Sequence, residues 1–125
     1  GLQKLSYESF TADPINIDAA ERVLQIAIES CLNIGNRLIS LLQLEQPVRT
    51  PESYADIFAI MCELKILERP FSERLVEMAK FRNRLVHLYW DLDAEMTFRI
   101  LQENIDDLKQ FQDEVVKFLN KNRSL

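Results

Sequence analysis

The chain has 125 residues, 47% of them hydrophobic, which suits one compact domain that buries a core without help from disulfides or metal ions. A formal net charge of -5 argues against a protein that coats nucleic acid by nonspecific phosphate neutralisation, so any such contact must be local. No apolar run reaches the roughly 18 residues that a membrane-spanning helix needs, and no secretory signal layout opens the sequence. We therefore expect a single domain over residues 1–125 in a soluble, cytoplasmic protein without a membrane partner.

The first third of the sequence predicts one long helix. The segment from Leu5 to Phe10 resembles the end of a helix whose start is absent, so we expect a truncated N-terminal helix. Asp18, with Glu21 three residues later, then forms a capping-box-like helix start. Apolar residues recur from there at steps of four and three, which predicts a helix to about Leu42 that is buried on more than one side. These residues are Ala20, Leu24, Ala27, Cys31, Ile34, Leu38 and Leu41.

Two further helices are predicted in the middle of the chain. Thr50 followed by Pro51 supplies a capping hydroxyl and then a proline at the first helical position. A helix should therefore run from Pro51 to about Ile66, with Tyr54 on its apolar stripe. After an interruption, the next helix should run from about Phe71 to Leu88.

The last third predicts one long helix that is capped by Asp93 and whose apolar residues continue to Leu119. No segment alternates with period two for long enough to form a sheet, so we expect an all-α fold, an antiparallel bundle of four or five helices. Cys31 and Cys62 lie among apolar residues, at a separation that fits neither a zinc cluster nor a redox pair. We expect both to be free thiols in the core, and we expect no metal and no cofactor.

The segment from Lys80 to Tyr89 is the one place where several cations, the sole histidine and a tyrosine gather. On an ideal helix Asn83 and His87 lie about 40° apart, whereas Arg82 and His87 lie about 140° apart. A straight helix thus presents the arginine and the histidine on two neighbouring faces. The long side chain of Arg82 could bend around to share an anion with His87, particularly if the helix loosens near Tyr89. A symmetric dimer would also solve this geometry, because each copy would complete the site of the other.

These residue types suit cleavage of an RNA strand without a metal ion. That reaction needs a base for the ribose 2′-hydroxyl, an acid for the leaving 5′-oxygen and cations for the phosphorane charge. His87, with an ordinary pKa of about 6.5, would be the acid or base, and Arg82 the phosphate clamp. Asn83 would orient the imidazole, bond a ribose hydroxyl or simply face solvent. A lone histidine beside arginines also fits a surface or interface position, so the chemistry alone indicates only an anion site.

Arg82, Asn83, His87 and Tyr89 together resemble the R-N-x-x-x-H-x-Y signature of the HepT-like members of the HEPN superfamily. Residues 21–31 are similar to the first core helix of that family. The resemblance spans the chain from about residue 5 to residue 119. Asn33 departs from it, at a place where we expect an aspartate.

The resemblance implies a helical-bundle homodimer in which two Arg–His motifs face a shared cleft. It implies a metal-independent endoribonuclease toxin, with Arg82 and His87 as its catalytic residues and RNA as its substrate. It also implies a cognate nucleotidyltransferase antitoxin that transfers AMP to the motif tyrosine, here Tyr89. An AMP group beside Arg82 would place negative charge where an RNA phosphate must sit. Without the motif, Tyr89 would fit an interface aromatic equally well.

Glu29 and Asn33 on the predicted first core helix are candidate supporting residues of this site. They also fit a purely structural role, filling a gap between helices or satisfying each other at i and i+4. A function of another class stays open as well, a non-catalytic nucleotide-binding or adaptor subunit of a nucleotidyltransferase partner. Such a subunit would use the same cationic cleft to hold a phosphate without cutting RNA.

Overall fold

The computed structural model describes residues 6–87 and 94–122. This part of the chain is helical and contains no strand, which confirms the expected all-α class. Its six helices outnumber the predicted four or five. In chain order they are α1 (Tyr7–Ala12), α2 (Pro14–Gln43), α3 (Tyr54–Glu63), α4 (Arg69–His87), α5 (Ala94–Glu103) and α6 (Ile105–Lys121).

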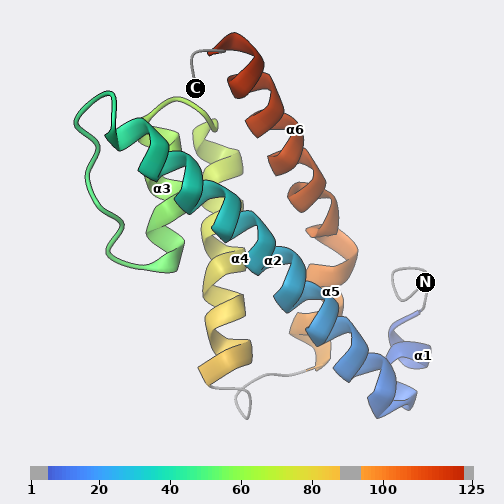
Figure 1. The fold of residues 1–125 in the computed structure, drawn as a ribbon. Coiled ribbons are helices and arrows are strands. Elements are labelled where there is room, and N and C mark those ends of the chain that lie inside the picture. The colour runs from blue at the N-terminus through green and yellow to red at the C-terminus, as the bar shows by residue number, and fades with distance from the viewer. Residues whose placement is uncertain (1–5, 88–93, 123–125) are drawn as a thin grey trace.

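The long helix α2 organises the bundle. It contains 30 residues and contacts all five of the other helices. Figure 1 shows α2 crossing the molecule diagonally in front of α4 and α5. Its buried residues follow the predicted steps of three and four, so the amphipathic pattern is what places this helix at the centre. They are Ala20, Leu24, Ile28, Cys31, Leu32, Gly35, Leu38, Ile39 and Leu42.

The predicted start of this helix at Asp18 is wrong. The helix begins at Pro14, and the Asp13 side chain accepts a hydrogen bond from the Ile15 amide at 2.9 Å. A capping carboxylate followed directly by proline at the first helical position is a stronger start than an acidic pair one turn later. The short helix α1 has its own cap, because the Ser6 hydroxyl accepts from the Ser9 amide.

The predicted start of the third helix at Pro51 is also wrong. Ser53 caps α3 by accepting from the Asp56 amide at 3.2 Å, which leaves Thr50 and Pro51 in the preceding loop. The helix ends at Glu63 and not near Ile66, because the chain turns at Lys65 with a φ of 63°. Hydrogen bonds from the amides of residues 66 and 67 to the carbonyl of residue 61 close this turn.

The helix boundaries shift in the second half too. α4 begins at Arg69, since Pro70 lies in the first turn, where its missing N–H leaves no hydrogen bond unmade. The predicted last helix is divided at Asn104 into α5 and α6. The amide of Asp107 bonds the carbonyl of Asn104 at 3.0 Å at the start of α6. The predicted cap, Asp93, lies outside the described residues.

The core lies between α2 and the four longer helices around it. Phe58 of α3 meets Phe111 of α6 edge to face, with ring centroids 5.5 Å apart. The prediction for Cys31 is confirmed, because it is 1% exposed and burial raises its pKa to about 11. Cys62 is only partly buried, so the prediction that it is a core residue is wrong. No helix among the described residues is long and apolar enough to span a membrane.

A glycine permits the close crossing of α2 and α3. A Cβ at Gly35 would lie 2.7 Å from Cγ2 of Ile57 and 3.1 Å from Sδ of Met61. Both neighbours belong to α3, and the Ile57 methyl is carried on a branched Cβ that cannot swing away. The two helices therefore approach more closely here than they could with any other residue at position 35.

We predict that Gly35→Ala lowers the free energy of unfolding by roughly 1 kcal/mol, measured by urea denaturation. Overpacking of a core destabilises a protein by about 1–3 kcal/mol. The higher helix propensity of alanine than of glycine offsets about 1 kcal/mol of this loss. Ser40→Ala, at an exposed position of the same helix, is the matched control and should be close to neutral. A Gly35→Ala protein as stable as the wild type would contradict the crossing described above.

Candidate functional site

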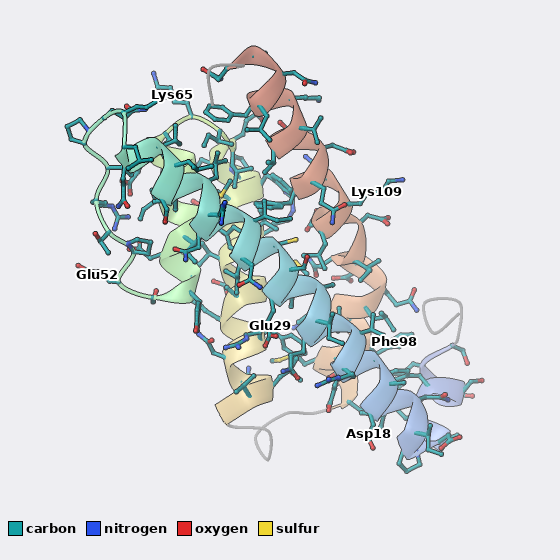
Figure 2. All side chains as sticks on the ribbon, viewed as in Figure 1. Asp18, Glu29, Glu52, Lys65, Phe98 and Lys109 are labelled. Atoms are coloured by element: carbon teal, nitrogen blue, oxygen red, sulfur yellow. The ribbon has the colours of Figure 1, made fainter. Side chains whose placement is uncertain are left out.

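Arg82 projects from the second half of α4 toward α2. Its Nε and Nη2 atoms donate hydrogen bonds to Oε1 of Glu29, at 2.9 and 2.7 Å. The side chain of Arg82 is only 14% exposed and that of Glu29 is 33% exposed. The pair therefore lies at the edge of the core, where solvent screens it only in part. Figure 2 shows Glu29 near the middle of α2, beside the lower part of α4.

Two more groups fix the guanidinium. The ring of Tyr54, the first residue of α3, lies under it at 4.9 Å from its carbon to the ring centroid. Nη1 of Arg82 donates to Oδ1 of Asn83 at 3.4 Å, and Gln25 donates to the same Glu29 oxygen at 3.2 Å. Residues from three helices thus hold one cation in a set orientation.

The charge state of the pair follows from these contacts. The hydrogen bond from Arg82 holds the pKa of the Glu29 carboxyl below its ordinary value, against the opposing effect of burial. A second hydrogen bond, from Gln25, acts in the same direction. Glu29 is therefore ionised at neutral pH, and the cation of Arg82 faces a full negative charge.

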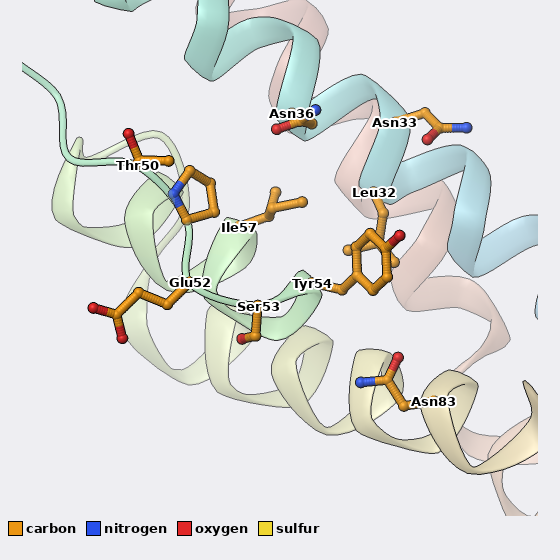
Figure 3. Close-up of a pocket in the computed structure, with 10 residues that line it drawn as sticks. Leu32, Asn33, Asn36, Thr50, Glu52, Ser53, Tyr54, Ile57 and Asn83 are labelled. Carbon is orange, nitrogen blue, oxygen red and sulfur yellow. The ribbon is translucent and has the colours of Figure 1, made fainter. Parts of the chain in front are cut away.

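A pocket of about 580 Å³ opens beside this pair. It lies between α2, the loop before α3, the start of α3 and Asn83 of α4, as Figure 3 shows. Tyr54 belongs both to the pocket wall and to the contact with Arg82. The lining residues are Leu32, Asn33, Asn36, Thr50, Pro51, Glu52, Ser53, Tyr54, Ile57 and Asn83.

The loop that forms the floor of this pocket is held by Arg49. Its guanidinium makes two hydrogen bonds to the carboxylate of Asp56, at 2.6 and 2.7 Å, and contacts Glu63 at 2.6 Å. Asp56 also accepts from the backbone amide of Glu52 at 3.0 Å. Hydrogen bonds from Arg49 hold the pKa values of Asp56 and Glu63 below their ordinary range. The loop is thereby tied to both ends of α3.

Cations also gather on the side of α4 that faces α5. A second cavity, of about 350 Å³, is lined by residues of both helices, including Arg74, Lys80, Arg84 and Arg99. Arg74 pairs with Asp107 at 3.2 Å and Lys80 with Glu77 at 3.5 Å. In a chain of net charge -5, positive side chains are thus concentrated around α4.

The structure brings several of the predicted site residues together. Arg82 contacts both Glu29 and Asn83, and Asn33 lines the adjoining pocket. Glu29 bonds Arg82 and Gln25, so the structural alternative of a Glu29–Asn33 pair is wrong.

The remaining predicted residues stay untested. His87 is the last residue of α4, but its side chain lies outside the described residues, and so does the whole of Tyr89. Within residues 6–87 and 94–122, no three His, Cys, Asp or Glu side chains form a group that could hold a metal ion.

Sequence reasoning missed two members of the site. Tyr54 was assigned to an apolar stripe, yet it is 52% exposed and carries the guanidinium of Arg82. Asn36 was not singled out, although it follows Asn33 at the spacing that places both on one helix face. Two asparagines one turn apart on the same helix were the available signal.

We predict that Glu29→Gln lowers the free energy of unfolding at pH 7 by about 1 kcal/mol, because it leaves Arg82 without its charged partner. The pKa of Glu29 is lowered on folding, so this contribution is complete above the unfolded value of about 4.3 and is lost as the pH falls through the folded value. Urea denaturation between pH 7 and pH 3 should therefore show the two proteins converging in acid. A difference independent of pH would contradict the ion pair.

Comparison with known proteins gives a consistent set of relatives. A family model described as ribonuclease HepT-like matches residues 2–115. The mRNA nuclease HepT of Shewanella oneidensis is 29% identical over 90 residues, which are 72% of this chain and 65% of that protein. The putative RNase YutE of Bacillus subtilis is 26% identical over 101 residues, 81% of this chain and 67% of that protein. The match to the Shewanella protein thus spans just under two thirds of its length.

A solved structure of similar fold is that of the tri-AMPylated Shewanella oneidensis HEPN toxin in complex with the MNT antitoxin. It superposes with a TM-score of 0.75 at 28% sequence identity. The alignment covers 86% of this chain and 78% of the solved one. The helical bundle described above is therefore shared over most of its length.

Proposed function

Because the chain belongs to the ribonuclease HepT-like family, we propose that it is a metal-independent endoribonuclease, the toxin of a toxin–antitoxin system that acts on RNA in the cytoplasm. The observation that carries this proposal is the orientation of Arg82. Its guanidinium is held by Glu29, Tyr54 and Asn83 beside an open pocket, five residues before the sole histidine on the same helix. The name of the Shewanella relative, an mRNA nuclease, supports the same reading.

In this proposal each residue has a distinct role. Arg82 binds the scissile phosphate and stabilises the charge that develops on it. His87 moves the proton, as base toward the 2′-hydroxyl or as acid toward the leaving oxygen. Asn83 contacts the ribose or the imidazole. Glu29 is a positioning residue, because it touches Arg82 and holds the guanidinium in place before RNA arrives.

The active unit we propose is a homodimer. On an ideal helix, five residues turn a side chain by about 140°, so one copy alone would not bring an arginine and a histidine at this spacing together. A two-fold axis near the end of α4 would place the histidine of one copy near the arginine of the other. Besides Arg82, the cations on the α5-facing side of α4 would supply a local attraction for RNA that the chain as a whole, with its net charge of -5, lacks.

The regulator we propose is a nucleotidyltransferase antitoxin that transfers AMP to Tyr89. The similar Shewanella toxin is tri-AMPylated and is bound to an MNT antitoxin, which supports the same regulation here. In this proposal, a phosphate on the hydroxyl of Tyr89, two residues after His87, would add negative charge to the site that must bind the RNA phosphate. Modification should then exclude the RNA phosphate and leave the fold intact.

We predict that the purified, unmodified protein cleaves single-stranded RNA in the presence of EDTA, and that His87→Ala lowers the rate by about 10²- to 10⁴-fold. Arg82→Ala should lower it by a similar factor, measured by gel analysis of a labelled transcript. Arg69→Ala, at the opposite end of α4, is the matched control and should keep full activity.

Two outcomes would contradict the nuclease. Intact RNA after incubation with the wild-type dimer would exclude the proposed activity. Nucleotide binding that survives His87→Ala and is lost in Arg82→Ala, without any strand scission, would favour the adaptor subunit instead.

We predict that co-expression with the cognate nucleotidyltransferase raises the intact mass of the protein by whole AMP groups and suppresses RNA cleavage. Tyr89→Phe should abolish the mass increase, because it removes the accepting hydroxyl. Tyr54→Phe is the matched control, since it removes a hydroxyl from the tyrosine that lies against Arg82. A mass increase that persists in Tyr89→Phe would show that another residue is the acceptor.

A further inference from the structure

We propose that the pocket between α2, α3 and Asn83 binds an unpaired base of the RNA, that of a nucleotide next to the scissile phosphate. This inference rests on the proposed nuclease function and names the class of substrate, a single-stranded segment. The pocket, about 580 Å³, falls within the usual range for sites that bind small molecules, roughly 300–1,000 Å³.

The pocket lies where a base must lie if Arg82 holds the phosphate. Tyr54 lines the pocket, and the guanidinium carbon of Arg82 is 4.9 Å from the centroid of its ring. Asn83 likewise lines the pocket and bonds Arg82. A base and its neighbouring phosphate are joined through one ribose, so the two groups of a single nucleotide can occupy the pocket and the cation together.

Tyr54 offers a surface for stacking. Its residue surface is 52% exposed even though the guanidinium covers part of the ring. Proteins that recognise single-stranded RNA stack unpaired bases on such aromatic rings and on arginine planes. Leu32 of α2 and Ile57 of α3 add apolar surface to the pocket wall, as Figure 3 shows.

The upper wall offers groups for the edge of a base. Asn33 and Asn36 line the pocket from α2, and within the described part of the chain neither amide makes a hydrogen bond. By contrast, Asn16, Asn104 and Asn122 each donate to a nearby oxygen. A carboxamide carries donors and an acceptor in one plane and so matches the edge of a base.

The charge of the pocket favours a base over a phosphate. Among the described residues that line it there is no lysine and no arginine, and Glu52 adds a carboxylate. A phosphate placed inside would therefore have no cation in the pocket wall. An exocyclic amino group of a base would instead find neutral acceptors in the side-chain amides that line the pocket.

The experiment measures binding of short 2′-fluoro oligonucleotides, which cannot be cleaved because they lack the 2′-hydroxyl. One base at a time is replaced by an abasic residue, and affinity is measured by fluorescence anisotropy. For the wild type we expect one position at which loss of the base weakens binding by about 5- to 150-fold. Tyr54→Leu and Asn36→Ala should bind more weakly and lose much of this discrimination, whereas Tyr54→Phe should keep it.

Asn120→Ala, an exposed asparagine of α6, is the matched control and should bind like the wild type. Circular dichroism melting checks the fold of each variant, and the exposed Asn36→Ala serves as the decisive variant if Tyr54→Leu unfolds. The pocket assignment is overturned if no single base matters to the wild type, or if Asn36→Ala discriminates as strongly as the wild type. A protein that shows base discrimination but cleaves no RNA would instead contradict the proposed function and retain the pocket.

Discussion

The ion pair between Arg82 and Glu29 is the interaction on which the site depends. It joins the second half of α4 to the middle of α2, the helix that every other described helix contacts. Because the arginine side chain is 14% exposed, its charge could not remain at this place without a nearby anion. The ion pair with Glu29 neutralises the guanidinium and also fixes its direction. One contact therefore stabilises the buried charge and orients the arginine.

This arrangement has a consequence for catalysis in the proposed reaction. A guanidinium that is already held by Glu29, Tyr54 and Asn83 loses little conformational freedom when a phosphate binds. Its charge is at the same time shared with a carboxylate, so the phosphate gains less attraction than it would from an isolated arginine. Preorganisation strengthens the binding of a phosphate and partial neutralisation weakens it, and the contact with Glu29 causes both effects.

The sequence predicted the fold class and the long central helix because both follow from the spacing of apolar residues. It misplaced helix ends where two capping signals competed. Asp13–Pro14 and Ser53 prevailed over Asp18 and Thr50, and nothing in the apolar pattern ranks such caps. The break at Asn104 was missed for a similar reason, because the apolar steps continue across it.

The site was predicted in part. Arg82 and Asn83 stood out because they lie in the cationic segment with the sole histidine, and Glu29 because it lies on the predicted first core helix. Tyr54 did not, since an aromatic at helical spacing is usually a core residue, and only the packing of α3 against α4 brings it under Arg82. Contacts between residues far apart in sequence depend on helix crossings, which composition and periodicity leave open.

The helix crossing at Gly35 lies behind the pocket, whose rear wall belongs to the core and whose front wall is exposed. Ile57 is both the side chain against which Gly35 packs and a residue of the pocket wall, so the rear of the pocket is continuous with the core. The front is built from residues 50–54 and from exposed asparagines, which carry little of the packing. Substitutions in the front wall can therefore change which ligand the pocket binds while the bundle stays folded. Related chains with the same fold can in this way differ in specificity.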